Sequence, residues 1–395
     1  MALPEVYVVA ALRTAIGTFG GSLRDVPLSD LATTVVQAAI RASGAPSDSF
    51  GHLVMGNVIP TEPVDAYLSR VAAIRAGLGK EVPAFNVNRL CGSGLQAIVS
   101  AAQALMHGDA DVAIGAGAES MSRGPYLAMN ARWGQRMGDM QMVDYMINIL
   151  HDPFHRIHMG VTAENVADKY GVSREDMDAL AAESHRRAAA AIRAGYFREQ
   201  IVPIALNTRK GTVEFAVDEH VKPDTTVEAL AKLKPAFRKE EGRVTAGNSS
   251  GINDGAGAVV LATAEAVRKY NLQPIARLVT YAFAGVEPEL MGIGPVPATK
   301  KALERAGLKA ADMDVIESNE AFAAQACAVV RQLELNPAKV NPNGSGISLG
   351  HPVGATGAII TTKAVHELQR IKGRYALATM CIGGGQGIAA IFERC

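Results

Sequence analysis

Short apolar runs alternate with helix-length amphipathic segments along the front of the chain. Val6–Ala11 and Leu53–Ile59 are predicted strands, whereas Leu28–Ser43 and Tyr67–Ala76 have the spacing of helices. Strands that alternate with helices are typical of α/β folds, in which helices cover the faces of a sheet. We therefore predict an α/β fold.

The alternation continues on both sides of a cysteine. The predicted strand Ala84–Val87 leads to Cys91, a predicted helix runs from about Leu95 to His107, and Val112–Gly117 is the next strand. A cysteine between a strand and a helix N-terminus lies near backbone N–H groups and the positive end of the helix dipole, which stabilise a thiolate. The position predicts that the pKa of this thiol is lowered.

The last third of the chain repeats the same order of elements. A glycine-rich loop around His351 precedes the final predicted helix, and the sequence CIGGGQG follows the final predicted strand. This similarity of the two ends predicts an internal duplication. The predicted strands here are Arg277–Ala282, Val315–Ser318 and Tyr375–Met380, and the predicted helices are Thr299–Ala306, Ala321–Leu333 and Ala358–Gln369.

Residues 122–246 break this rhythm. They contain Trp133, the single tryptophan of the chain, and they are predicted to be mostly helical over Ala163–Arg193 and irregular elsewhere. We interpret them as an insertion that covers a site. The predicted organisation is an N-terminal half of residues 1–121 plus 247–272, an inserted lid of residues 122–246, and a C-terminal half of residues 273–395.

Composition excludes several classes of function. The 39 Lys and Arg residues balance 39 Asp and Glu residues, which argues against a general nucleic-acid-binding protein. No run of 18 apolar residues occurs, and no basic segment precedes the first apolar stretch. We therefore expect neither a transmembrane helix nor a signal peptide, and we expect a cytoplasmic protein without a membrane partner.

Two of the four cysteines are candidates for chemistry, because Cys91 and Cys381 are both flanked by glycines. His351, displayed on the loop NPNGSGISLGHPVGATGA, is available to take a proton from a thiol. The glycines after Cys381 offer N–H groups for an oxyanion. In SNEAFAAQ, Asn319 ends a strand and opens a helix, where it is either a helix cap or a catalytic group.

Two other patterns suggest different chemistry. Residues 247–251, GNSSG, fit a nucleophile elbow on Ser249, and with Asp312 and His351 downstream they give the chain order of a serine hydrolase. The second pattern is a group of three histidines, which suggests a metal site. Apart from one aspartate, no carboxylate or cysteine has ligand spacing with them, so we predict no metal. The histidines are His151, His155 and His158, and the aspartate is Asp152.

Taken together, the motifs resemble the thiolase family over essentially the whole chain. VNRLCGSGLQA, HMGVTAENVA, VTAGNSSGINDGA, NEAFAAQ, GHPVGATGA and CIGGGQG occur in the order of that family. The CGSG form is similar to the biosynthetic acetyl-CoA acetyltransferase and bacterial β-ketothiolase branch, and HDPFHRIHMG resembles the β-ketothiolases that supply polyhydroxyalkanoate synthesis. The resemblance implies a duplicated five-layer α/β/α/β/α fold with an inserted loop domain, and a homotetramer built as a dimer of dimers.

The resemblance also implies a ping-pong acyl transfer: condensation of an acyl-CoA with acetyl-CoA, or thiolytic cleavage of a 3-ketoacyl-CoA. Cys91 would hold the acyl group and His351 would help to deprotonate it. Cys381 would move the α-proton, Asn319 would hold a water at the enolate oxygen, and the N–H of Gly383 would bind the acyl oxygen. Coenzyme A would be substrate and product, with no permanently bound cofactor.

Coenzyme A contacts are implied mainly in the insertion and at its edges. Lys222 stands where many relatives have an arginine that packs on the adenine, and lysine stacks less well. The implied contact residues are Leu150, His158, Met159, Lys222, Phe237, Ala246, Ser250, Ala321 and Phe322.

Two further alternatives are kept beside the serine hydrolase. A decarboxylating ketoacyl synthase pairs one cysteine with two histidines, and the second cysteine in CIGGGQG argues against it. A CoA-binding protein without turnover would bind acetoacetyl-CoA and release no CoA from it. The presence of both cysteines and His351 argues against this alternative.

Overall fold

Two half-sheets with the same strand order frame the protein, in a computed structural model that describes residues 4–209 and 211–395. The first three residues of the predicted N-terminal half lie outside the described residues. The N-terminal half-sheet contains, in spatial order, β4 (Ala84–Val87), β3 (Phe50–Gly56), β5 (Val112–Ser120), β11 (Asn253–Thr263) and β1 (Val6–Thr14). The C-terminal half-sheet contains β13 (Val315–Ser318), β14 (Tyr375–Ile382), β15 (Gln386–Arg394) and β12 (Ala276–Gly285).

The pairing directions of the four equivalent strands agree, and β4 at the edge of the N-terminal half-sheet has no counterpart among the described strands of the C-terminal one. In the N-terminal half, β3 is parallel to β5, and β11 is antiparallel to both β5 and β1. In the C-terminal half, β13 is parallel to β14, and β15 is antiparallel to both β14 and β12. This repeat of order and direction confirms the internal duplication.

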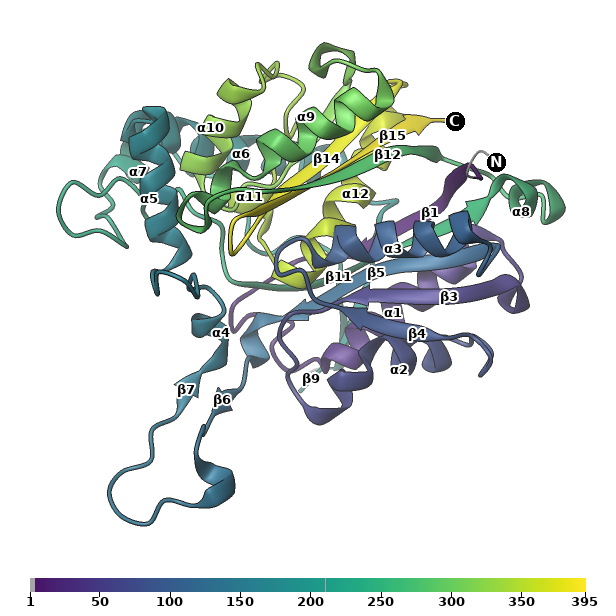
Figure 1. Ribbon diagram of the computed structural model, residues 1–395, viewed down its shortest axis with the longest axis horizontal. Coiled ribbons are helices and arrows are strands. Elements are labelled where there is room, and N and C mark those ends of the chain that lie inside the picture. Colours follow the sequence, from purple (N-terminus) through teal and green to yellow (C-terminus); the bar gives the residue numbers. More distant parts are fainter. Residues whose placement is uncertain (1–3, 210) are drawn as a thin grey trace.

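The half-sheets touch where β1 meets β12. Tyr7 pairs with Arg277 and Val8 pairs with Ala276, so hydrogen bonding joins the two halves into one sheet. Two short strands add to it, β2 (Gly17–Thr18) beside β11 and β8 (Ile201–Val202) beside β1. The five-layer prediction nevertheless holds, because helices lie between the two half-sheets (Figure 1).

Helices form the other three layers. α1 (Leu28–Ser43) and α2 (Leu68–Arg75) cover the outer face of the N-terminal half-sheet, and α9 (Pro295–Ala306), with α10 (Ala323–Gln332) beside it, covers the outer face of the C-terminal one. Between the half-sheets lie α3 (Ser93–His107) and α12 (Val353–Arg370) (Figure 1).

Helix α1 illustrates why the sequence predicts the outer layers well. Its buried residues recur at the spacing of one helix face, and Gly44 ends it with a φ of 68°, a conformation that glycine adopts readily. The structure gives the helix the predicted bounds. The buried residues are Leu28, Ser29, Leu31, Ala32, Val35, Val36, Ala39 and Ser43.

The two central helices cross at glycines. A Cβ atom added to Gly94 would lie 2.6 Å from the backbone nitrogen of Ala358, and one added to Gly357 would collide with the backbone of Leu95. The backbones of α3 and α12 therefore approach more closely than any larger side chain permits. Both helices begin beside the candidate residues, because α3 starts two residues after Cys91 and α12 two residues after His351.

The connection between β5 and β11 contains the whole of the predicted insertion. β8 joins the main sheet, α5 and α6 pack against α10, and the ribbon of β6 and β7 protrudes from the body (Figure 1). The division at residues 122 and 246 stays a prediction. The elements of the connection are β6 (Tyr126–Leu127), β7 (Val143–Asp144), α4 (Tyr145–Asn148), α5 (Met159–Tyr170), α6 (Arg174–Ala194), β8, β9 (Ile204–Thr208), β10 (Gly211–Phe215) and α7 (Val227–Ala231).

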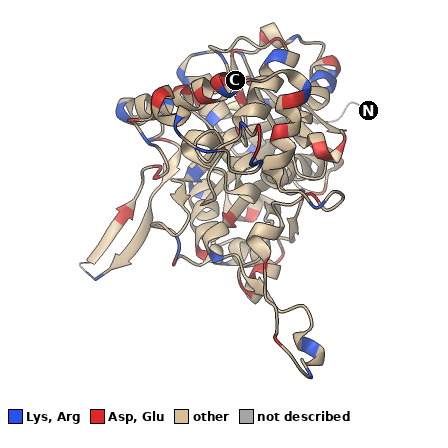
Figure 2. Ribbon diagram, turned by 90° about the vertical axis from the view of Figure 1, so that its left-hand side faces the viewer, with Lys and Arg blue, Asp and Glu red and all other residues tan. Residues whose placement is uncertain are grey.

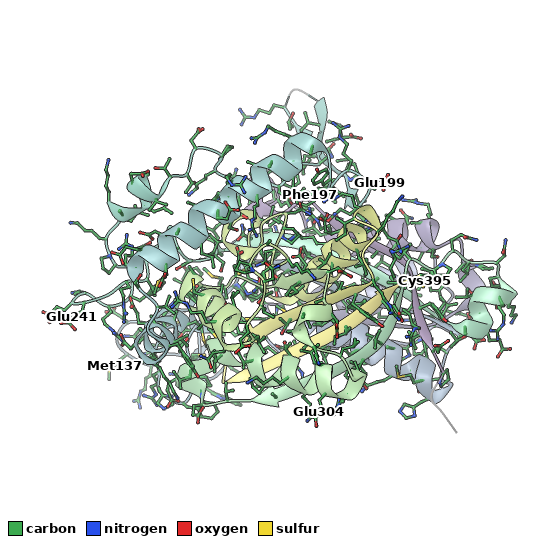
Figure 3. All side chains as sticks on the ribbon, turned by 90° about the horizontal axis from the view of Figure 1, so that it is seen from above. Met137, Phe197, Glu199, Glu241, Glu304 and Cys395 are labelled. Carbon is green, nitrogen blue, oxygen red and sulfur yellow. The ribbon has the colours of Figure 1, made fainter. Side chains whose placement is uncertain are left out.

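The surface reflects the composition of the chain. Basic and acidic residues lie interspersed on the face shown in Figure 2, as their equal numbers suggest. Exposed Cys395 and Met137 of the protruding ribbon lie on opposite sides in the view from above (Figure 3). Within the part of the chain that the structure describes, no helix has the length and apolarity needed to cross a membrane.

Candidate active site

A cavity of about 340 Å³ brings most of the predicted site residues together. Both halves and the segment between β5 and β11 contribute side chains to its wall. Of the predicted residues, all except Asn319 and Lys222 line it, namely Cys91, Leu150, His158, Met159, Phe237, Ala246, Ser250, Ala321, Phe322, His351, Cys381 and Gly383.

The two remaining residues lie outside the cavity wall. Asn319 is fully buried behind His351, and its Nδ2 atom is 3.4 Å from Nε2 of that ring. Its Oδ1 atom is buried without a hydrogen-bond partner. Lys222 is exposed, and its backbone N–H donates to Nδ1 of His185. Asn319 is therefore placed to act on the ring of His351, whereas Lys222 is outside the cavity.

Cys91 is half-buried at the start of α3, where the Ser93 hydroxyl accepts the Arg89 N–H and donates to the carbonyl of Leu90. Burial raises the pKa of the Cys91 thiol, and the N–H groups of Gly383 and of Cys91 itself act against that rise. The predicted lowering of this pKa is therefore wrong, because the loss of water outweighs the helix dipole. The free enzyme holds the thiol protonated at neutral pH, so its reaction requires a base.

Cys381 is fully buried at the end of β14. Burial and the neighbouring Cys91 both raise the pKa of its thiol. The following turn contains Gly384 and Gly385 with φ values of 80° and 83°, which side chains other than glycine rarely adopt. This tight turn places the N–H of Gly383 beside the sulfur of Cys91, as an oxyanion-binding group requires.

His351 is buried, and burial lowers its pKa to about 4. The imidazole is therefore neutral at pH 7 and able to accept a proton. Its backbone N–H donates to Oδ1 of Asn253 at 2.9 Å, and its Nδ1 lies 2.7 Å from Oγ1 of Thr356. Thr356 of α12 thus holds the ring of His351, and Asn253 of β11, in the other half, holds its backbone.

Glu119 connects the loops of the two halves. Its fully buried carboxylate accepts four N–H donors, one of them the backbone N–H of Gly354 at the start of α12, at 2.8 Å. Burial raises the pKa of Glu119, whereas the N–H donors favour the ionised form. The carboxylate thereby fixes the position of α12, and with it the His351 loop. The other donors come from Asn57, Val58 and Ile59, at 2.8 to 3.0 Å.

Aromatic rings form one wall of the cavity. His158 stacks on Phe237 with ring centroids 4.7 Å apart, and Phe237 meets Phe322 edge to face. Nδ1 of His158 accepts the N–H of Gly160, and burial lowers the pKa of this histidine to about 4. The ring is therefore neutral, and the wall suits a largely apolar chain.

A small apolar recess of about 20 Å³ opens beside Cys91. Val58, Leu90 and Ile149 line it, together with residues that it shares with the main cavity. An acyl group on Cys91 would meet these side chains first.

The three residues of the serine hydrolase hypothesis do not form a catalytic triad. Ser249 lines the cavity, but its hydroxyl donates to the carbonyl of Thr245 at 2.7 Å. Asp312, which would be the acid of such a triad, is exposed on the far side of the C-terminal half in the segment Ala310–Asp312. A nucleophilic serine needs a base within hydrogen-bonding reach, and Ser249 is bound to a carbonyl instead.

The three histidines of the metal hypothesis do not converge. His151 and His158 meet edge to face with ring centroids 5.1 Å apart, and His158 stacks on Phe237. Nδ1 of His155 lies 3.0 Å from Oδ2 of Asp152, away from the other two rings. In residues 4–209 and 211–395, no group of three or more candidate ligands is placed to hold a metal ion.

Three residues of the site were not predicted from the sequence. Asn253 and Thr356 contact His351, and Glu119 holds the start of α12. A buried acid at the end of the glycine-rich strand Val112–Ser120 was a signal for Glu119, because an unpaired carboxylate is costly to bury. Asn253 and Thr356 lie within predicted motifs, but only the fold shows which atom each one contacts.

Comparisons with known proteins agree with this geometry. The chain matches "Thiolase, N-terminal domain" over residues 6–265 and "Thiolase, C-terminal domain" over residues 272–394. It is 65% identical over 390 residues to the beta-ketothiolase BktB of Cupriavidus necator, with 99% of each chain covered. It is 47% identical over 392 residues to the mitochondrial 3-ketoacyl-CoA thiolase of Mus musculus, with 99% of this chain and 98% of the relative covered.

Solved structures give the same result. The structure of human mitochondrial 3-ketoacyl-CoA thiolase covers 100% of both chains at 46% identity and a TM-score of 0.98. The same human enzyme in complex with CoA covers 100% of this chain and 99% of its own at 46% identity and a TM-score of 0.96. The predicted fold class is thereby confirmed.

Proposed function

The chain belongs to the thiolase family, and from that premise we propose how its residues carry out the thiolase reaction. The protein is an acyltransferase of the thiolase type, as its relatives named beta-ketothiolase, acetyl-CoA acetyltransferase and 3-ketoacyl-CoA thiolase are. The convergence of Cys91, His351 and Cys381 on one cavity carries the proposal.

In the first half-reaction, the sulfur of Cys91 attacks the thioester carbonyl of an acyl-CoA. His351 takes the thiol proton and passes it to the departing CoA sulfur, so that an acyl-cysteine and free CoA result. The N–H groups of Cys91 and Gly383 stabilise the carbonyl oxygen as it becomes negative. The raised pKa of the Cys91 thiol makes this base necessary.

In the second half-reaction, Cys381 acts in its thiolate form, a minor form because burial raises the pKa of its thiol, and removes an α-proton from acetyl-CoA. The resulting enolate carbon attacks the acyl carbonyl, the bond to Cys91 breaks, and the proton ends on the Cys91 sulfur. The enolate oxygen would be held by a water on Asn319. Thiolytic cleavage of a 3-ketoacyl-CoA is the same sequence reversed.

The aromatic wall supports a pantetheine site. His158, Phe237 and Phe322 offer a neutral, largely apolar surface that suits an uncharged chain. Ser250, half-buried at the cavity wall, adds a polar group beside it. Lys222 is exposed outside the cavity, and we propose that it meets the charged nucleotide end of CoA there.

We also propose that the protein is a cytoplasmic homotetramer. The ribbon of β6 and β7 extends from the body and exposes Trp133, Met137 and Met129 by 89%, 81% and 70%. An isolated ribbon with apolar side chains in water is costly, so a second copy of the chain is its expected partner. Light scattering should give the mass of four chains, and a variant with Trp133, Met129 and Met137 replaced by serine should give a smaller assembly.

Peptide mapping after incubation with acetyl-CoA tests the catalytic proposal. We expect one acetyl group on Cys91 and release of one equivalent of CoA. Acetyl on Ser249 with none on Cys91 would favour a hydrolase, and binding of acetyl-CoA without acetylation of the protein or release of CoA would favour a protein without turnover. Release of carbon dioxide from malonyl-CoA during condensation would favour the ketoacyl synthase.

A further inference from the structure

The Thr356 hydroxyl makes two close polar contacts inside the protein. Its Oγ1 atom lies 2.7 Å from Nδ1 of His351 and 2.9 Å from the carbonyl oxygen of Pro352. Thr356 and His351 are 2% and 5% exposed, so water has little access to either contact. The protons shared by these three groups must therefore come from the groups themselves.

The number of protons decides their arrangement. A hydroxyl carries a single hydrogen, and a carbonyl oxygen accepts only. If the hydroxyl donated to Nδ1, its 2.9 Å contact with the Pro352 carbonyl would join two oxygens with no hydrogen between them. If the hydroxyl donates to that carbonyl, Nδ1 must carry the hydrogen of the other contact. Only the second arrangement makes both contacts hydrogen bonds.

The rest of α12 supports the second arrangement. Thr361 and Thr362 donate to the carbonyls of Gly357 and Ala358, four residues earlier, at 2.8 and 2.9 Å. Pro352 likewise lies four residues before Thr356. Donation from the Thr356 hydroxyl to the Pro352 carbonyl is therefore the hydrogen bond that buried threonines of this helix make. An Nδ1–H that donates to Thr356 leaves the lone pair of the neutral ring on Nε2. The amide nitrogen of Asn319 lies 3.4 Å from Nε2 and 3.5 Å from Nδ1, so this contact does not distinguish the two nitrogens, and the contacts of Thr356 carry the assignment.

We propose that Thr356 is a positioning residue, which holds His351 with its hydrogen on Nδ1 so that Nε2 is the nitrogen that accepts the Cys91 proton. This inference rests on the proposed function and deepens it. During acyl transfer the proton leaves the sulfur of Cys91 for Nε2, the sulfur–carbon bond forms, the bond from the carbonyl to CoA breaks, and the proton passes from Nε2 to the CoA sulfur.

Without the Thr356 hydroxyl, a buried Nδ1–H has no acceptor. The ring then lowers its free energy by moving the hydrogen from Nδ1 to Nε2. In that form His351 cannot accept the thiol proton, although it still fills its place and can donate a hydrogen bond. The acylation of Cys91 should therefore slow, whereas the binding of acyl-CoA should not change.

The experiment compares Thr356→Val, which keeps the size of the side chain and loses the hydroxyl, with Thr356→Ser, which keeps the hydroxyl. Rapid quenching and intact-mass measurement give the rate of Cys91 acetylation by acetyl-CoA. We expect T356V to slow this rate by about tenfold or more, T356S to stay within about threefold of the unaltered enzyme, and the KM for acetyl-CoA to stay within about twofold. Thr356→Ala provides a second variant without the hydroxyl, should the valine variant fail to fold.

Thr361→Val is the matched control. Thr361 is fully buried in the same helix and makes the same kind of hydrogen bond, but it does not contact His351. T361V should acetylate Cys91 at the rate of the unaltered enzyme. Acetylation of T356V or T356A at that rate, or equal slowing of T356S and T356V, would overturn the role of the hydroxyl. Failure of the unaltered enzyme to acetylate Cys91 would instead overturn the proposed function.

Discussion

The two halves of the protein join one equivalent pair of antiparallel strands by connections of very different length. In the C-terminal half, the antiparallel strands β14 and β15 are joined by three glycines, residues 383–385. In the N-terminal half, the equivalent strands β5 and β11 are joined by residues 121–252. The short turn carries Cys381 and the N–H of Gly383 to the cavity, whereas the long connection supplies most of the cavity's outer wall. Equivalent strands of the two halves are thus joined by a tight turn in the C-terminal half and by a long connection that covers the cavity in the N-terminal half.

The halves also divide the chemistry. The N-terminal half supplies the nucleophile Cys91 at the start of α3, and the C-terminal half supplies His351 and Cys381, which move protons. The equivalence of α3 and α12 explains why these groups meet, because both helices begin at the same cavity. Substitution of Cys91 or of the groups that hold His351 should therefore slow acylation of Cys91, whereas substitution of Cys381 should slow only the transfer of the α-proton.

The largest effect should follow the loss of the nucleophile. Cys91→Ser should lower the rate of acetoacetyl-CoA consumption by CoA-dependent thiolysis by about a thousandfold or more, because a hydroxyl is a far weaker nucleophile than a thiolate. Cys327→Ser is the control, since Cys327 lies between α6 and α10 in a different cavity and should retain activity within about twofold. Substantial thiolysis by the Cys91 variant would refute the assignment.

The next effect should appear where the halves cross. Gly357→Ala places a methyl group against the backbone of α3 and should lower the free energy of unfolding by about 3 kcal/mol, because neither helix can move aside without loss of packing. Urea denaturation measures this change. Gly285→Ala is the control, since nothing within 4 Å except one backbone oxygen would meet its methyl group. Equal stability of the two variants would show that the crossing tolerates separation.

A smaller effect should follow a change at the carboxylate that connects the loops. Glu119→Gln should lower the free energy of unfolding by about 2 kcal/mol, because the new NH₂ group faces N–H donors where an oxygen accepted them. The rate of thiolysis should fall as well, since α12 carries the His351 loop. Exposed Glu265→Gln should change neither quantity. An unchanged melting curve for the Glu119 variant would show that Glu119 is not needed to join the halves.

The smallest effect should come from the surface of the long connection. Lys222→Arg should lower the KM for CoA by about two- to fivefold, because guanidinium stacks on adenine better than ammonium does. A pantetheine thioester without the nucleotide should show no such change and serves as the control. A similar change with both substrates, or none with CoA, would exclude an adenine contact at Lys222.

Much of the frame could be predicted from the sequence. The helix Leu28–Ser43 and the strands Ala84–Val87 and Val315–Ser318 have the predicted bounds, because their apolar spacing matches a single face or a buried run. The strand Asn253–Thr263 is not among the strands predicted from the sequence. Its glycines have a packing reason that periodicity does not show, since a side chain at Gly257 would press on α12.

The sequence indicated which residues gather at the site better than it indicated their pKa values and hydrogen-bond partners. The glycine-flanked motifs indicated Cys91, His351 and Cys381, because such loops bring backbone close to a substrate. The predicted direction of the Cys91 pKa shift was wrong. The pKa is raised by burial, and the residues that bury this thiol come from distant parts of the chain. The partners of the His351 ring were missed for the same reason.

Proton exchange in heavy water tests the division of chemistry most directly. The methyl protons of acetyl-CoA are followed by mass in D₂O, with the unaltered enzyme and with Cys381→Ala, while Cys91 acetylation is measured in the same samples. We expect C381A to acetylate Cys91 at the rate of the unaltered enzyme. Its exchange of methyl protons should be slower by a factor of about a hundred or more. Exchange by C381A at the unaltered rate would contradict it.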